Sequence, residues 1–506
     1  HSLSYWSIQQ NELVSSLIET RTMNNTFKRL LAIAAIAVVI SIQACTPKEG
    51  PDTVFINGTI YTVDADNSTS QAVAVKDGMI TAVGTTKEIT KLVGKNTKIV
   101  DLIGMAMTPG LIESHAHLMG IGYNKLELDL MYVKTYDELV EKVAEAVAKA
   151  EPGQWITGRG WHQDKWIEKP EVMEKGFQTH DQMSAVSPDN PVYLRHASGH
   201  ASFANAKAME MAGVNRLNLE SLSGEVEGGE IIKDKLGNPT GVFTERASSL
   251  VGKLVPQETE ERAEQALEMA IQELLEKGIT SFHDAGSGQA FIDRLQRFKA
   301  QGKLKVRQYV MLTGRSPELL EQWYEKGPMI DPDHMVTVRS IKLNCDGALG
   351  PRGAWLLEAY TDRADHYGHE TLPMETVNTV SEKALAKGFQ VCSHAIGDRA
   401  NREILDRYEA SFKKFPNIDS KDVRFRIEHA QHLNVNDIPR FGEMGVIAAM
   451  QAVHMSSDRP WAIDRLGKAR IEEGAYVWQK LLQSGAKIIN GTDAPVEPVD
   501  PLPSFF

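Results

Sequence analysis

The feature that most constrains this chain is an alternation of short apolar runs with helical segments through its second half. Each run is almost continuously apolar, and segments between runs, such as Thr259 to Glu276, repeat apolar residues at helical spacing. Strands buried on both faces and joined by helices are typical of a parallel sheet. Eight strands are expected, the first entering His115 and the others at residues 279–283, 306–312, 340–345, 389–394, 423–429, 446–450 and 486–490. This α/β pattern predicts a TIM-like (β/α)₈ barrel with its chemistry at the C-terminal strand ends.

The first predicted strand ends in a pair of histidines. His115 and His117 are two positions apart, so an extended backbone points both side chains to the same face. Neutral imidazole is the commonest protein ligand for zinc and related ions. Two ordinary surface histidines would give the same spacing, and the other strand ends must decide between these interpretations.

Further polar residues occur where the barrel would place its active site. Lys342 lies in the fourth strand, His394 ends the fifth, His429 ends the sixth and Asp493 follows the eighth. The C-terminal ends of barrel strands share one mouth, so these side chains are expected to converge there. A lysine reaching solvent or a hydrogen-bonded core histidine would explain one such residue, but not the whole set. The sequence therefore predicts a metallo-barrel.

Other segments are assigned around the barrel. Residues 46–108 are expected to form a tether and a small β-sandwich domain, with hairpins at the turn pairs Asn57-Gly58 and Asp77-Gly78 and a further strand at 98–102. The barrel is assigned to residues 109–506. Residues 118–255 follow strand 1 as an insertion, with a helix at 136–149 and a strand at 191–196. The insertion is expected to cover the active-site mouth.

The N-terminal region indicates a secreted protein. Residues 23–45 contain a short basic region, an apolar run too short to span a bilayer, and Ala44 before Cys45. This resembles a bacterial lipoprotein signal with Cys45 as the lipidated residue; a buried apolar helix with an incidental cysteine is the alternative. The expected location is the cell envelope, lipid-anchored on the periplasmic side, and Thr46 favours the outer membrane. Residues 1–22 precede a plausible initiator methionine and are expected to be non-native upstream sequence.

Charge and cysteine content narrow the choice of ligand. The net charge is −12, with both signs scattered along the chain, which argues against nucleic acid and favours a small-molecule substrate. Cys345 and Cys392 lie in predicted core strands, where a buried thiol is expected. Three widely separated cysteines do not form a disulfide framework or a CxxC zinc site.

Together these motifs resemble the amidohydrolase superfamily, and most closely its branch of YtcJ-like proteins and N-substituted formamide deformylases. The resemblance runs from about Asp52 to the last residue. It is carried by His115-Ala-His117, the Lys342 strand with Asp346-Gly-Ala-Leu-Gly350, His394-Ala-Ile-Gly-Asp398, Arg426-Ile-Glu-His429-Ala-Gln431 and Gly491-Thr-Asp493-Ala-Pro495. The resembling proteins continue past strand eight, so the C-terminal part of the barrel is expected to be missing from this chain.

The resemblance implies a ligand set and a reaction. It assigns His115, His117 and Asp493 to a more buried metal, His394 and His429 to a second, and a bridging carbamate formed from carbon dioxide to Lys342. Zinc suits these ligands, and iron or manganese also fits. Asp493 would pass a proton from the attacking water to the departing nitrogen of an amide or formamide. Glu113 occupies the position, two residues before His115, where the family usually has aspartate. If its longer side chain reaches the metal ligands, it would hold them in place without binding the metal itself.

Substrate contacts and the bond cleaved are less defined by sequence. Trp161, His200 and Arg352 match segments that approach the pocket in the resembling proteins, and His454 is a further candidate. A packed indole, an exposed imidazole and a surface arginine are the alternatives for the first three. The same metal site would also suit an ester, lactone, phosphoester or deamination substrate. A non-catalytic periplasmic metal-binding lipoprotein is the remaining alternative.

Overall fold

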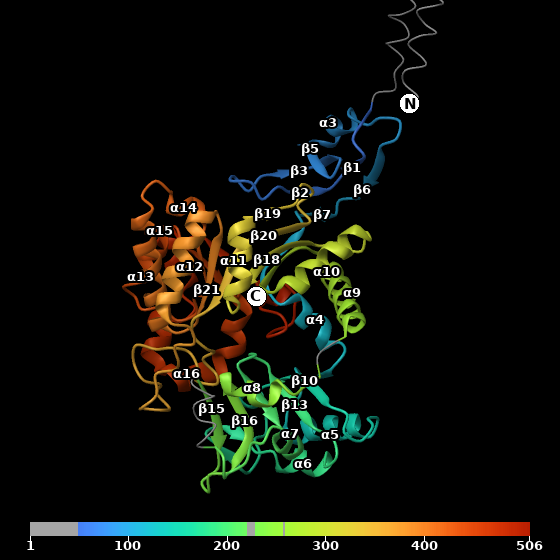
Figure 1. Cartoon of the computed structure of the whole chain (residues 1–506). Coiled ribbons are helices and arrows are strands. Elements are labelled where there is room, and N and C mark those ends of the chain that lie inside the picture. The colour runs from blue at the N-terminus through green and yellow to red at the C-terminus, as the bar shows by residue number, and fades with distance from the viewer. Residues whose placement is uncertain (1–48, 220–227, 257–258, 506) are drawn as a thin grey trace, which may run out of the picture. The chain divides into compact units, whose positions relative to one another are not determined.

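The computed structural model describes residues 49–219, 228–256 and 259–505 (Figure 1). These residues divide into two compact units, one ending at Pro109 and the other beginning at Gly110. Residues 1–22 and the predicted signal at 23–45, including Cys45, lie outside the described residues. Within the described ranges, no helix has both the length and the apolar character needed to cross a bilayer.

The first unit contains two small β-sheets and one short helix. The four-stranded sheet has the order β5 (Met79–Gly84), β4 (Ala72–Lys76), β1 (Thr53–Ile56) and β6 (Lys98–Asp101), and the three-stranded sheet has the order β3 (Thr69–Ser70), β2 (Thr59–Tyr61) and β7 (Ala106–Met107). Helix α3 (Thr86–Thr90) begins with a capping box between Thr85 and Glu88. Val54, Ala72, Ala74 and Ile89 form the small core.

One of the two predicted hairpins in this unit is wrong. Asp77-Gly78 does join the antiparallel strands β4 and β5. At Asn57-Gly58, in contrast, β1 and β2 enter different sheets, because β1 already pairs with β4 on one side and with β6 on the other. Asn57 has a positive φ of 58°, which turns the chain out of the first sheet.

The second unit contains the predicted eight-stranded parallel barrel. Its strands are β8 (Leu111–Ala116), β17 (Ile279–Ser287), β18 (Arg307–Thr313), β20 (Val336–Asn344), β21 (Gln390–Ala395), β22 (Arg426–His429), β23 (Ile447–Met450) and β24 (Ile488–Asn490). Each strand pairs in parallel with the next. Strands β24 and β8, at the two ends of this order, also lie in contact. The order confirms all eight sequence-predicted strands.

Helices surround this barrel (Figure 1). They are α9 (Glu260–Glu276), α10 (Gln289–Ala300), α11 (Pro317–Lys326), α12 (Met374–Lys387), α13 (Asp398–Lys414), α15 (Ile438–Met444), α16 (Ala452–Gly474) and α17 (Trp478–Gln483). Helix α9 begins at the predicted N-cap Thr259, whose side chain accepts a hydrogen bond from the Arg262 N–H. Its predicted apolar positions are buried against the barrel strands, apart from the exposed Leu275.

The insertion after strand β8 forms a second sheet with its own core. The strands are β15 (Gly229–Lys233), β16 (Pro239–Glu245), β14 (Ala201–Ala204), β13 (Val192–His196), β10 (Ile156–Trp161) and β9 (Leu128–Asp129), in that order. Helices α5 (Tyr136–Val147), α6 (Asp181–Val186) and α7 (Ala206–Met211) pack on it. In Figure 1 the insertion, coloured cyan to green, lies at one end of the barrel beyond α4 (Leu118–Asn124).

Candidate metal centre and active-site cavity

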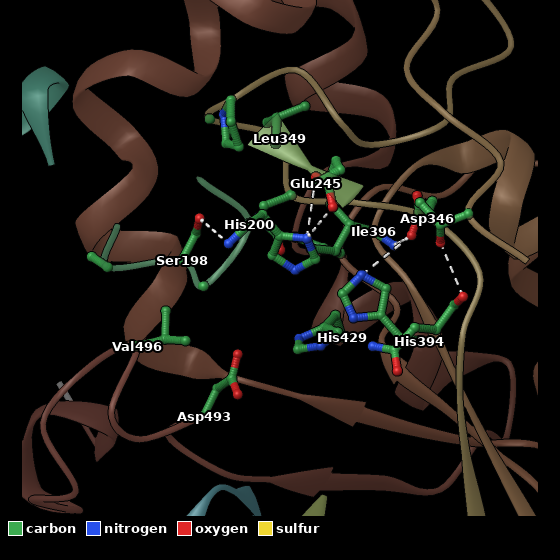
Figure 2. A pocket seen from close by; sticks show the side chains of 18 of the residues that line it. Ser198, His200, Glu245, Asp346, Leu349, His394, Ile396, His429, Asp493 and Val496 are labelled. Atoms are coloured by element: carbon green, nitrogen blue, oxygen red, sulfur yellow. Dashed lines mark hydrogen bonds and ion pairs between the residues drawn. The ribbon is translucent and has the colours of Figure 1, made fainter. Parts of the chain in front are cut away.

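A cavity of about 890 Å³ opens where the barrel strands end and the insertion approaches. Barrel residues Lys342, His394, His429 and Asp493 line it, and the insertion contributes Arg159, His162, Lys165 and His200. Figure 2 shows His200, His394, His429 and Asp493 around one open space. The cavity is large enough for a small organic molecule, and the predicted convergence of the strand ends is therefore seen in the structure.

Three of the predicted ligands form a compact cluster at the base of this cavity. One ligand atom each from His115, His429 and Asp493 lies within 4.8 Å of the other two. His115 is fully buried, and Asp493 is only 7% exposed. The oxygen Oδ1 of Asp493 is buried and has no hydrogen bond of good geometry, and only the imidazoles of His115 and His117, at 3.6 and 3.2 Å, lie close to it. Two imidazoles and a carboxylate oxygen without a hydrogen-bond partner fit a divalent metal ion such as zinc.

The hydrogen bonds behind the two imidazoles point their free nitrogens into the cluster. His115 Nδ1 lies against the Glu428 carboxylate, which leaves Nε2 3.6 Å from Asp493 Oδ1. His429 Nδ1 lies 2.8 Å from Gln451 Oε1, while the Gln451 amide donates to the Ala449 carbonyl at 3.1 Å. That donation fixes the amide oxygen as the acceptor. Both histidines are thus held with Nε2 directed into the cluster, as a metal ligand requires.

Lys342 extends into the same cluster from β20. Its Nζ lies 3.3 Å from His115 Nε2, and the residue is 4% exposed. Burial lowers the pKa of the Lys342 ammonium, since a charged group loses its hydration there. Burial likewise lowers the pKa of His115 to about 4 and those of His394 and His429 well below their ordinary value. The imidazoles are therefore neutral, as metal ligands must be.

The two remaining predicted ligands lie at the edge of the cluster. His117 Nε2 is 3.2 Å from Asp493 Oδ1, and its side chain is 42% exposed. The His394 ring centre is 4.4 Å from that of His429, and its Nε2 lies 3.3 Å from Asp346 Oδ1 (Figure 2). Asp346 in turn accepts hydrogen bonds from the N–H groups of Trp355, Ile396 and Gly397. All six predicted ligands thus gather at one end of the barrel.

Glu113 ties the first and last barrel strands together. Its carboxylate accepts from the His115 N–H at 2.9 Å and from the Thr492 N–H and hydroxyl, the hydroxyl at 2.8 Å. Burial raises the pKa of Glu113 to about 7. The longer side chain therefore reaches the backbone beside both His115 and Asp493, and supports the site as the sequence suggested.

The other predicted substrate contacts have mixed outcomes. His200 lines the cavity and lies 3.0 Å from the Glu245 carboxylate, and His454 also lines it. Trp161 does not: its indole is fully buried in the core of the insertion and donates to the Leu194 carbonyl at 3.1 Å. Arg352 is also outside the lining, because its guanidinium pairs with Asp362 at 2.7 Å.

Several residues that shape the site were not assigned a role from sequence. Glu428 holds His115 and is itself held by Arg426 from the same strand, at 2.6 Å. Asp284 at the end of β17 accepts from the Leu118 N–H at 2.8 Å, next to His117. The available signal was a carboxylate inside a segment predicted to be a barrel strand, because a buried charge requires a partner.

The fold and this cluster define a class of protein, the metal-dependent hydrolases built on a (β/α)₈ barrel. Residues 98–506 match the amidohydrolase family, which covers most of the chain. The chain therefore belongs to the amidohydrolase family.

Individual relatives agree with this membership. The protein YtcJ of Bacillus subtilis is 32% identical over 455 residues, which cover 89% of this chain and 82% of YtcJ. The N-substituted formamide deformylase of Arthrobacter pascens is 26% identical over 421 residues, which cover 78% and 72%. A crystal structure of a metal-dependent hydrolase from Pyrococcus furiosus has a TM-score of 0.67 and 27% identity, with 89% and 87% covered.

Proposed function

We propose that this protein hydrolyses a non-peptide carbon–nitrogen bond, of the amide or formamide type, in a small molecule. The observation that carries the proposal is the cluster of His115, His429 and Asp493 at the base of a cavity of about 890 Å³. The similarity to an N-substituted formamide deformylase supports this choice of bond.

The residues at the strand ends would hold the metal. His115, His117, His394, His429 and Asp493 are the proposed ligands of one or two ions, and Lys342 would be a further ligand in the form of a carbamate. The lowered pKa of Lys342 supports this role, because only the neutral amine reacts with carbon dioxide. When bound, a divalent ion such as zinc lowers the pKa of a coordinated water and polarises the substrate carbonyl.

Asp493 would transfer the proton of the attacking water during the reaction. Asp493 has an oxygen without a hydrogen-bond partner that faces the cavity residues, so its carboxylate is placed to accept the proton of the attacking water. The same carboxyl group would then deliver the proton to the departing nitrogen, because an amine leaves far more readily than an amide anion. The insertion residues Arg159, His162 and His200 line the cavity and limit access of bulk water.

Metal content provides the first test of this proposal. The purified wild-type protein is expected to hold one or two divalent ions per chain. Lys342→Ala is expected to lose at least one ion and, on a panel of formamides and N-acyl amines, at least about 100-fold in kcat/KM, because a proposed ligand is gone. The measurement is metal analysis by mass spectrometry together with product release at saturating bicarbonate.

Lys165→Ala is the matched control, since Lys165 is another lysine that lines the cavity but pairs with Glu497 at 2.9 Å. It should keep the full metal content. A folded wild-type protein without bound metal would contradict the proposal. If the protein hydrolyses only esters or lactones, the proposed carbon–nitrogen bond is wrong but the proposed metal centre stands. Metal without turnover of any substrate would favour a non-catalytic metal-binding protein.

The N-terminal segment supports a second, independent proposal about location. We propose that Cys45 is lipidated and that the body of the protein is anchored on the periplasmic side of a bacterial envelope. In cells, Cys45→Ser is expected to move the protein from the membrane pellet to the soluble or unprocessed fraction. Labelling with a fatty-acid analogue should mark the wild type alone. Equal labelling of the variant would contradict lipidation at this residue.

A further inference from the structure

Four arginines are buried in the described residues, and one of them differs from the rest. Arg294 pairs with Glu260 at 2.8 Å, Arg426 with Glu428 at 2.6 Å, and Arg465 with both Asp164 and Asp362. Arg159, which is 8% exposed, makes no ion pair with any described carboxylate. A buried charge without a counter-charge costs several kcal/mol, so a fold retains one only where something else compensates it.

The contacts of the Arg159 guanidinium leave part of it without an acceptor. Arg159 lies in β10 of the insertion and lines the cavity. Its Nη2 donates to the Ala197 carbonyl at 2.7 Å. Its Nε is buried without a hydrogen-bond partner, and no described residue accepts from Nη1. The Ala197 contact fixes the direction of the group and uses one of its five N–H donors. The donors of Nη1 and the second donor of Nη2, which point the same way, have no acceptor among the described residues.

None of the acidic side chains that line the cavity forms an ion pair with Arg159: Asp493 lies among the proposed metal ligands, Asp346 accepts three backbone hydrogen bonds, and other side chains engage the rest. Glu245 is paired with His200, Glu497 with Lys165, and Asp458 with Gln431 and Tyr476. Burial lowers the pKa of Arg159 to about 10, so the guanidinium remains a cation at neutral pH. Asp493 and Glu127 act on this charge only from a distance, and the guanidinium faces the cavity without a direct ion pair to any described carboxylate.

We propose that Arg159 binds a carboxylate on the substrate, so that the preferred substrates are amides or formamides that carry a carboxylate near the scissile bond. A guanidinium matches the two oxygens of a carboxylate with parallel N–H donors. Substrate binding would then complete the ion pair that the fold leaves open. The inference rests on the proposed hydrolysis of a carbon–nitrogen bond and names the substrate class for that same site.

Matched pairs of ligands test this inference. N-formylglycine, N-acetylglycine and N-formyl-β-alanine are each compared with the corresponding neutral amide by titration calorimetry. The protein is Asp493→Asn, which removes turnover from the measurement, and its metal content is measured first because Asp493 is a proposed ligand. At least one acid is expected to bind about 30-fold or more tightly than its amide. Arg159→Met in the same background should erase that ratio, and Arg159→Lys should restore part of it.

Arg195→Met is the matched control. Arg195 lies opposite Arg159 on the neighbouring strand β13, but it pairs with Glu127 at 2.8 Å and does not line the cavity. Its replacement should leave the ratio of acid to amide affinity unchanged. A general folding defect would weaken both ligands equally and would not move this ratio.

The outcomes separate this inference from the proposed reaction. Acids that bind through Arg159, in a protein that hydrolyses no amide when Asp493 is intact, would support the carboxylate site and contradict the reaction. Amide hydrolysis with equal kcat/KM for acids and neutral amides would support the reaction and overturn the site. Acid preference that survives Arg159→Met would also overturn it.

Discussion

Asp493→Asn is expected to lower kcat by about 100- to 10,000-fold, the range that a positioned general base contributes. Asparagine keeps the size of the side chain and one carbonyl oxygen, but it cannot take a proton from water at neutral pH. The backbone at this position has a positive φ of 58°, which asparagine adopts more readily than most residues. The Asp493 N–H also donates to the His115 carbonyl at 2.8 Å, and this bond does not depend on the side chain. The variant should therefore fold normally, and single-turnover kinetics would measure the loss directly.

Asp458→Asn is the comparison that isolates this role. Asp458 is a second carboxylate of the same cavity, held by the hydroxyl of Tyr476 at 2.7 Å and the amide of Gln431 at 2.8 Å. Its replacement should leave kcat within about tenfold of the wild type, because no proton transfer is assigned to it. Equal losses in the two variants, at unchanged melting temperature, would show that Asp493 has no special part in proton transfer.

The barrel was predictable because its signals are local and repeated. Continuous apolar strands such as residues 446–450, together with amphipathic helices, appear in the sequence with the period of each element. Eight such strands can close only in a few ways. The change of sheet at Asn57-Gly58 was not predictable in the same way. The turn pair is visible in the sequence, but the sheet that each flanking strand joins depends on partners far along the chain, here β6 and β7.

The grouping of the proposed metal ligands was also predictable from their positions at the ends of the barrel strands, because these ends share one mouth. The groups that orient them were harder to find. Gln451 and Glu428 act on His429 and His115 through side chains that only the closed barrel brings together. Trp161 shows the opposite error, since its place in a motif suggested the pocket while its large apolar surface is buried in the core of the insertion. Arg159 lies two residues before Trp161, but nothing in the sequence distinguishes it from a surface arginine. The absence of an ion pair is visible only in three dimensions.

The side chain of Arg426 supports the cluster of proposed metal ligands through a single carboxylate, that of Glu428. Its Nε and Nη2 donate to the two oxygens of Glu428 at 2.6 and 2.7 Å, and Nη2 also donates to the Ser114 carbonyl at 2.8 Å. Burial alone would raise the pKa of Glu428, but the Arg426 charge and the His115 contact hold that pKa well below its ordinary value. Arg426 is therefore the main group that keeps the carboxylate orienting His115 charged.

Arg426→Met is accordingly expected to lower the free energy of unfolding by about 3–5 kcal/mol, the cost of leaving one member of a buried pair alone. Urea denaturation of the metal-free protein at constant pH measures this change without a contribution from bound ions. The double variant Arg426→Met/Glu428→Gln should recover most of the loss, since no uncompensated charge remains and the glutamine oxygen can still accept from His115. Arg407→Met, which breaks a surface pair with Glu403 at 3.3 Å, should cost less than about 1 kcal/mol. If the buried and the surface substitutions cost the same, the Glu428 carboxylate is compensated by other groups, and the orientation of His115 does not depend on Arg426.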